Sequence, residues 1–70
     1  MEFDGYMLYL QKYNGYWVGE PYDTLEEIQY DLDNGVYDDD YAWYLVVGKS
    51  HINGDQALAQ GKLHPKNKRR

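Results

Sequence analysis

The chain has 70 residues with 12 acidic and 7 basic side chains, 9 tyrosines, 2 tryptophans and no cysteine. This length allows one small domain with a thin core, because so short a chain buries only about 60% of its unfolded surface. The lack of cysteine excludes disulfides, cysteine-based zinc sites and thiolate chemistry. The acidic start does not match a signal peptide, and no apolar run approaches the ~20 residues of a membrane span. We therefore expect a soluble intracellular protein.

The charge is divided unevenly along the chain. All 12 acidic residues and only two of the seven cations lie in residues 1–60, which gives that segment a net charge of −10. Residues 61–70 hold the other five cations and no acid, for a net charge of +5. We therefore expect an acidic domain over residues 1–61, followed by a basic, disordered tail over residues 62–70.

The first expected element is a β-hairpin over residues 6–20. Its first half is rich in strand-favouring aromatic residues, and the Asn-Gly pair at residues 14–15 is the strongest signal for a two-residue hairpin turn. A two-residue turn would place Trp17 on the same face as Leu8 and Leu10, the expected core side. The opposite, unusually aromatic face would hold Met7, Tyr9, Tyr13, Tyr16 and Val18.

Residues 23–34 follow the pattern of an amphipathic helix. Asp23 or Thr24 can cap its start, with a glutamate three positions on completing a capping box, and Gly35 suits the position after its end. The polar side contains no lysine or arginine, although like charges at (i, i+4) spacing destabilise a helix. That cost suggests another use for the charge. The apolar stripe comprises Leu25, Ile28 and Leu32, and the polar side comprises Glu26, Glu27, Tyr30, Asp31 and Asp33.

The second half of the domain predicts one or two further strands. An acidic loop at residues 38–40 precedes residues 41–47, which are apolar on both faces and therefore predict a central strand. Residues 55–61 fit either a short capped helix or a fourth strand, and their alanines and leucine favour the helix. The sequence thus predicts an α+β fold in which one main helix packs on a small antiparallel sheet of three or four strands, in the order β-β-α-β-(α or β).

Motifs for catalysis and for cofactor binding fail on spacing. Residues 48–50 read Gly-Lys-Ser, but a phosphate-binding loop requires glycine where Trp43 stands. A calcium loop that starts at Asp31 would need glycine at Val36 and glutamate at Ala42. His51 is the single histidine of the predicted domain, and no carboxylate pair lies in an apolar context that would separate two pKa values. We expect no catalytic residues, no cofactor, no metal site and no enzymatic activity.

Acidic charge together with surplus aromatics favours binding to a basic protein. The acidic domain would repel phosphate, so we expect it to make no direct contact with nucleic acid, and we expect no membrane partner. Helical carboxylates four residues apart lie ~6 Å apart, close to the roughly 6–7 Å between phosphates along one DNA strand. The candidate phosphate mimics are Glu26, Glu27, Asp31, Asp33, Asp38, Asp39 and Asp40. The aromatic candidates for partner or dimer contacts are Tyr9, Tyr13, Tyr16, Tyr30 and Tyr37.

These acidic residues, set among Tyr30, Tyr37 and Tyr41, resemble those of small acidic phage-encoded host-takeover proteins that mimic DNA. In length and charge the chain is similar to the inhibitor of the nucleoid protein HU made by a lytic Bacillus phage. This resemblance implies occupation of the DNA-binding arms of HU, loss of nucleoid organisation, and action in the host cytoplasm or nucleoid. Residues 12–19 also resemble the opening of ArdA-type antirestriction proteins.

Two other classes of function stay open at this point. The first is a phage or bacterial interaction module that inhibits a host polymerase, nuclease or defence protein without imitating DNA. The second is a small ligand-binding or enzymatic domain. Homodimerisation through an edge strand or the aromatic hairpin face is compatible with either binding function, because it would extend a short charge track and support a thin core.

Overall fold

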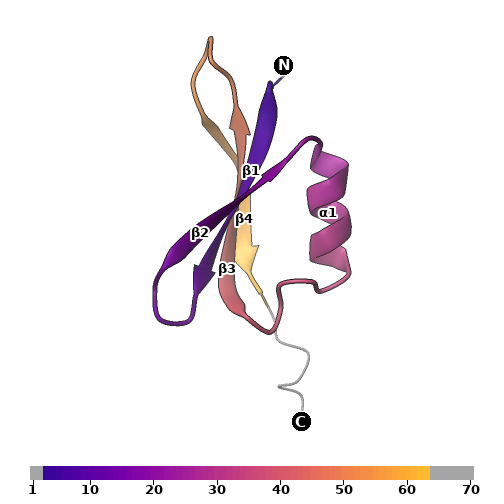
Figure 1. The fold of residues 1–70 in the computed structure, drawn as a ribbon, viewed down its shortest axis with the longest axis vertical. Helices are drawn as coiled ribbons and strands as arrows, with labels where there is room; N and C mark the ends of the chain where they lie inside the picture. The colour runs from indigo at the N-terminus through magenta and orange to yellow at the C-terminus, as the bar shows by residue number, and fades with distance from the viewer. Residues whose placement is uncertain (1–2, 64–70) are drawn as a thin grey trace.

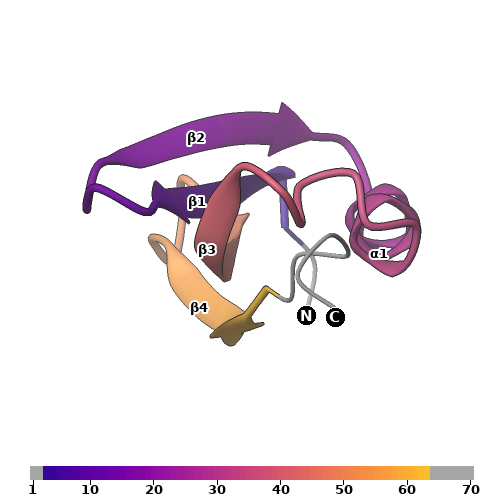
Figure 2. The ribbon, with the colours of Figure 1, turned by 90° about the horizontal axis from the view of Figure 1, so that it is seen from below.

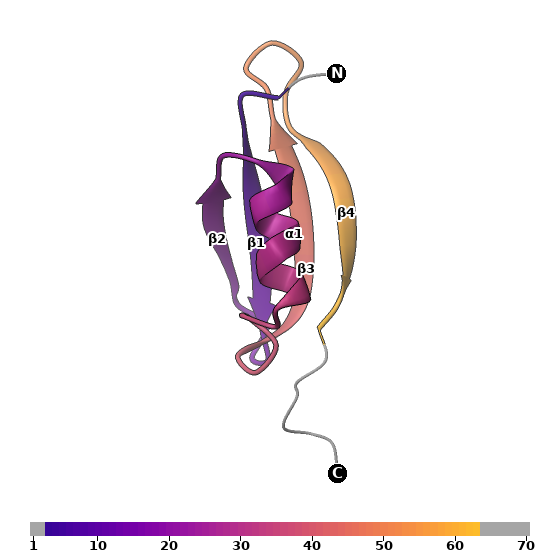
Figure 3. The same ribbon diagram turned by 90° about the vertical axis from the view of Figure 1, so that its right-hand side faces the viewer.

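The computed structural model describes residues 3–63, which form one four-stranded antiparallel sheet with a helix on one face (Figure 1). The strands lie in the order β2-β1-β3-β4. Figure 3 shows the helix in front of the two central strands, with an edge strand on each side. The elements are β1 (Gly5–Lys12), β2 (Trp17–Tyr22), α1 (Leu25–Asp33), β3 (Tyr41–Lys49) and β4 (Gln56–Lys62). The α+β class and the central position of β3 are confirmed.

The preference for a helix at residues 55–61 is wrong, because this segment forms the edge strand β4. Ala59 pairs with Val46 and Gly61 with Tyr44, after a register shift between Val46 and Val47. A helix this short is marginal by itself, whereas a strand satisfies the backbone groups along the edge of β3. A Cβ atom on Gly61 would lie 3.0 Å from the Tyr44 ring, so the glycine also makes room for that ring.

The register of the first hairpin differs from the expected one by one residue. The Lys12 backbone N–H donates to the Tyr16 carbonyl (2.7 Å), and the Gly15 N–H donates to the Lys12 carbonyl (2.9 Å). Residues 13–15 therefore form a three-residue loop. Gly15 has a φ of 97°, the left-handed conformation that such loops place before a bulge. The Asn-Gly pair predicted the turn correctly and its length incorrectly.

This change of register exchanges the two faces of β2. Leu10 pairs with Val18, and Gln11 pairs with Trp17. Because side chains alternate along a strand, a shift of one residue moves every side chain to the opposite face. Val18 therefore packs against the core, whereas Trp17, expected in the core, is 47% exposed.

The core lies between α1 and the sheet and consists of few side chains. Leu8 and Leu10 from β1, Ile28 from α1 and Val46 from β3 are buried. Leu63 joins them, and its backbone N–H donates to the Ala42 carbonyl (2.9 Å). Lys62 and Leu63, which the sequence assigned to the tail, thus lie in β4 and in the core, and residues 64–70 of the expected tail lie outside the described residues. Within residues 3–63, no helix is long and apolar enough to cross a membrane.

Candidate partner-binding surface

The orientation of α1 turns its acidic residues away from the sheet. The Glu27 backbone N–H donates to the Thr24 Oγ1 atom (3.2 Å), which identifies Thr24 as the N-cap between the two predicted choices. Ile28, 2% exposed, fixes the face that packs on the sheet. Glu26 and Glu27 lie in the exposed first turn, where the positive end of the helix dipole favours carboxylates. They form no ion pair among residues 3–63.

The end of α1 leads directly into the acidic loop. The Gly35 N–H donates to the Leu32 carbonyl (3.1 Å) and the Val36 N–H to the Asp31 carbonyl (3.1 Å). With a φ of 69° at Gly35, this pair of bonds is a Schellman cap, as the glycine predicted. Asp33 accepts a hydrogen bond from the Gln29 side chain (2.8 Å).

The predicted carboxylates follow one another along the chain and line two neighbouring hollows. Glu26, Glu27 and Asp31 line the first, and Asp33 and Asp38 line the second together with Lys62 of β4. Residues 34–40 are a series of turns in which Asp38 is half-buried, while Asp39 and Asp40 are exposed. We call this surface the acidic face; it comprises Glu26, Glu27, Asp31, Asp33, Asp38, Asp39 and Asp40.

Asp31 differs from its acidic neighbours because a tyrosine pair holds its carboxylate. The Tyr22 hydroxyl donates to Asp31 Oδ2 (2.6 Å) and lies 2.7 Å from the Tyr37 hydroxyl. A carboxylate only accepts, so Tyr22 donates to Asp31 and Tyr37 donates to Tyr22. Burial, followed by the hydrogen bond to Asp31, raises the pKa of Tyr22 well above its ordinary value. Through these hydrogen bonds, Tyr22 at the end of β2 is joined to Asp31 in the helix and to Tyr37 in the loop. Tyr22 was not among the predicted site residues.

The ion pairs of the described residues lie at the end of the sheet where β3 turns into β4. Lys49 Nζ contacts Asp55 (2.9 Å), and the His51 ring contacts Asp4. The hydrogen bond donated by the His51 backbone N–H is the main cause that lowers the pKa of the Asp4 carboxyl. These two carboxylates are therefore matched by cationic or hydrogen-bonding partners, whereas Glu26 and Glu27 face solvent.

The predicted aromatic residues do not form one group. Tyr13 and Tyr16 are exposed in the β1–β2 loop, and Figure 2 shows this hairpin end extending away from α1. Tyr30 is 70% exposed on the helix, between the carboxylates of the acidic face. Tyr30 lines the same hollow as Glu26 and Glu27, whereas the half-buried Tyr37 reaches the acidic face through its hydrogen bond with Tyr22.

Tyr9 belongs to a different surface, the face of the sheet opposite α1. It pairs with Leu45 in β3, while Gln11 pairs with both Trp17 and Trp43. No segment among residues 3–63 covers this side (Figure 2). We call it the open sheet face; it comprises Met7, Tyr9, Trp17, Trp43 and Leu45, while Val47 on the same face is only 7% exposed. The sequence predicted an aromatic second face, but with Val18 in the place of Trp17.

The described part of the chain offers no metal centre. No group of three or more histidine, aspartate or glutamate side chains among residues 3–63 could hold a metal ion. The single described histidine, His51, is exposed and contacts one carboxylate. The candidate surface of the described residues thus consists of carboxylates and aromatic side chains.

Comparison of the chain with family models, curated proteins and solved structures gives no match. The resemblance to phage DNA mimics accordingly stays a prediction from the residues. The assignment of function depends on the chemistry of the surfaces described above.

Proposed function

We propose that this protein is an acidic DNA mimic that binds the DNA-binding surface of a basic host protein and prevents it from binding DNA. The acidic face would occupy the sites of the phosphates, and Tyr30 would add contact area. The nucleoid protein HU, which the sequence resemblance implies, is the first partner to test. The protein would then act without catalysis in the host cytoplasm or nucleoid.

The observation that carries the proposal is the concentration of carboxylates in α1 and the loop after it, in a segment that supplies no cation of its own; Lys62 of β4 lies near only the Asp33 and Asp38 end. No lysine or arginine occurs between Lys12 and Lys49. Among residues 3–63, neither Glu26 nor Glu27 forms an ion pair that would compete with a partner's arginine or lysine. A concentrated field of one sign steers an oppositely charged protein toward the site and suppresses contacts with the wrong partners.

The dimensions of the acidic face also suit phosphate sites. The nine residues of α1 extend over roughly 13 Å at 1.5 Å per residue. Glu27 and Asp31, four residues apart, have Cβ atoms about 6 Å apart, similar to the phosphate spacing of one DNA strand. The loop that follows the helix adds the exposed carboxylates of Asp39 and Asp40. Two or three neighbouring phosphates would find counterparts on this side.

A pair of charge-neutralising variants tests this assignment. In the first, Glu26→Gln and Glu27→Gln together remove two charges from the acidic face. We expect the affinity for HU, measured by calorimetry in low salt, to fall at least tenfold, since each lost contact with a cation costs about 1 kcal/mol or more.

The control variant carries Asp4→Asn and Asp55→Asn, which change the net charge equally at the other end of the sheet. Its affinity should stay within about threefold of the unchanged protein, because exposed pairs such as Lys49–Asp55 contribute little to stability. Equal losses in the two variants would mean that net charge, and not the acidic face, determines binding. No binding of HU by the unchanged protein would remove HU as the partner.

The open sheet face favours a second candidate, an interaction module that inhibits a host protein without imitating DNA. Tyr9, Trp17 and Trp43 lie on this face, and tyrosine and tryptophan are enriched at protein interfaces. The same face could pair two copies, which would leave both acidic faces outward. Trp43→Ser tests these uses. The substitution would weaken a dimer, measured by sedimentation, or a partner complex, measured by pull-down, if either forms through this face, and it would leave binding through α1 unchanged.

A further inference from the structure

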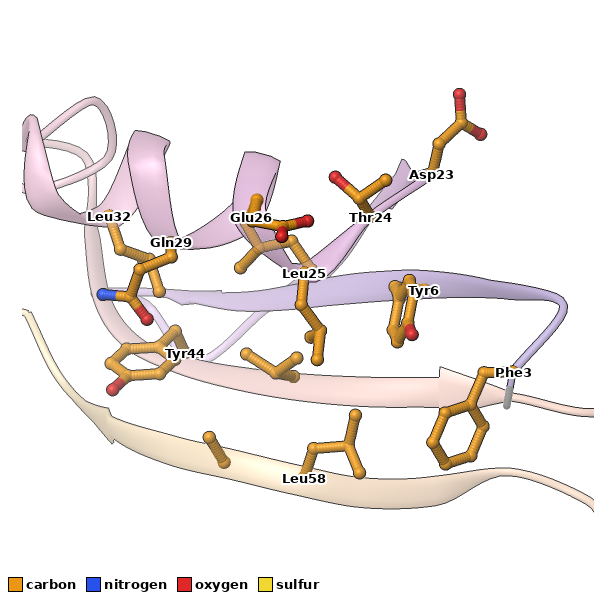
Figure 4. A pocket seen from close by; sticks show the side chains of 13 residues that line it. Phe3, Tyr6, Asp23, Thr24, Leu25, Glu26, Gln29, Leu32, Tyr44 and Leu58 are labelled. Carbon is orange, nitrogen blue, oxygen red and sulfur yellow. The ribbon is translucent and has the colours of Figure 1, made fainter. Parts of the chain in front are cut away.

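A groove lies beside the acidic face, between α1 and the strands β3 and β4. It has a volume of about 640 Å³, within the range of sites that bind small molecules and short peptide segments. Figure 4 shows Tyr44, Leu58 and Tyr6 along the sheet side, and Leu25 and Leu32 on the helix side. The groove is thus lined mainly by aromatic and aliphatic side chains.

The groove exists because a short helix does not span four strands. Ile28 draws α1 onto the central strands, so the neighbouring edge strand β4 remains uncovered on that face (Figure 3). Ala59 of β4 lines the groove and is exposed. Leu25 is 43% exposed although it begins the apolar stripe of the helix. The core therefore buries only part of the apolar stripe of α1.

The charged groups of residues 3–63 that line the groove are all acidic. Asp23 and Glu26 lie at the rim, just before α1 and in its first turn (Figure 4), and no lysine or arginine of the described segment lines the groove. Glu26 also lines the adjacent hollow with Glu27, Tyr30 and Asp31. The groove is consequently continuous with the acidic face, and an occupant would contact apolar surface and carboxylates together.

The chemistry of the groove selects among occupants. Mimicry of DNA phosphates requires only negative charges that contact a partner's lysines, so it does not explain why the floor of the groove is apolar. Residues 64–70 of the chain itself contain four cations but no leucine, isoleucine, valine, methionine, tyrosine, tryptophan or phenylalanine. Their side chains do not match this floor. A partner segment that carries both lysines and aliphatic side chains matches both the floor and the rim.

We propose that the groove binds a basic amphipathic segment of the partner protein, with aliphatic side chains against Leu25, Tyr44 and Leu58 and with lysine or arginine beside Glu26. This proposal rests on the proposed function, because the groove would supply the apolar anchor of the same interface. The anchor adds affinity that salt does not screen, since burial of apolar surface does not depend on ionic strength in the way that ion pairs do.

Two fluorescein-labelled decapeptides of equal charge test the groove without HU. Both alternate lysine with a second residue, which is leucine in one peptide and serine in the other. We expect the lysine–leucine peptide to bind the full-length protein at least tenfold more tightly by fluorescence anisotropy, a preference that persists in 0.5 M salt. Equal affinities would contradict the proposal, because binding would then depend on charge alone.

Three variants locate the preference. Leu25→Gln removes the aliphatic wall and keeps a residue of good helix propensity, and it should reduce the preference for leucine to about threefold or less. Ala59→Trp fills the groove from β4 and should have the same effect, so the test does not depend on one variant folding. Ile52→Gln removes an 82% exposed aliphatic side chain far from the groove and should leave the preference unchanged.

A leucine preference that survives both groove variants would place the contact elsewhere, such as on the open sheet face, and would overturn the proposal. A groove covered by a second copy of the chain would also overturn it; sedimentation would then show a dimer that Leu25→Gln converts to a monomer. Failure to bind HU together with a normal leucine preference would reject HU as partner and leave the groove assignment standing. The two hypotheses are therefore rejected by different results.

Discussion

Tyr22 shows how a single hydroxyl can organise part of the candidate site. Its hydrogen bonds to Asp31 and Tyr37 join the end of β2, the helix and the acidic loop. The sequence predicted Asp31 as a phosphate mimic and Tyr37 as a partner or dimer contact, but not that the two share a hydrogen-bond partner. That contact depends on the tertiary packing that brings residue 22 next to residues 31 and 37, and no local spacing encodes it.

Replacement of this hydroxyl should destabilise the fold measurably. In Tyr22→Phe the half-buried Asp31 carboxylate and Tyr37 hydroxyl lose their partner, and we expect the free energy of unfolding to fall by about 1–2 kcal/mol. Tyr37→Phe removes only the outer hydroxyl and should cost about 1 kcal/mol or less. Urea unfolding followed by circular dichroism measures both. A Tyr22→Phe protein as stable as the parent would show that the network does not support the site.

The same hydroxyl predicts a pH dependence in the alkaline range. The pKa of Tyr22 is raised in the folded protein above its ordinary value of 10.0. The folded state therefore keeps this proton while the unfolded chain loses it, so the contribution of Tyr22 is complete below about pH 10 and is lost as the pH rises further. Between about pH 9 and pH 11, the parent should lose more stability than Tyr22→Phe. Parallel curves for the two proteins would contradict this account.

Among the elements, those with a strong local pattern were predicted well. Helix α1, its Thr24 cap and Gly35 end, the acidic loop and the central strand β3 all follow from periodicity or capping chemistry. Strand β4 does not, because its alanines and leucine favour a helix and only pairing with β3 decides against it. The register of the first hairpin fails for a related reason, since an Asn-Gly pair fits both a two-residue and a three-residue loop.

A glycine substitution tests the observed hairpin loop directly. Gly15 has a φ of 97°, and a Cβ atom there costs roughly 1–2 kcal/mol because it approaches the backbone in the left-handed region. Gly15→Ala should therefore lower the midpoint of thermal unfolding by about 4–8 °C per kcal/mol lost. Gly5→Ala is the matched control, because a Cβ atom on Gly5 meets only the Tyr22 carbonyl oxygen, at 3.9 Å. Equal effects of the two substitutions would contradict the loop geometry.

As a whole, the molecule presents two opposite faces of different chemistry on a thin, elongated body of 46 × 23 × 15 Å. The α1 side combines carboxylates with the apolar groove, and the open sheet face combines tryptophans and tyrosine with aliphatic side chains. Charge and composition predicted the acidic face and an aromatic surplus. They could not predict the groove, because it results from a nine-residue helix that leaves β4 uncovered.

Displacement of DNA from HU would show directly whether this protein occupies the DNA-binding surface of HU. A labelled duplex bound to HU would be titrated with the protein at several salt concentrations and followed by fluorescence anisotropy. We expect complete displacement at low salt, weaker displacement as salt increases, and a clear loss of potency in the Glu26→Gln, Glu27→Gln variant. A stable ternary complex of HU, DNA and this protein would contradict the claim, because a mimic and DNA cannot occupy the same surface together.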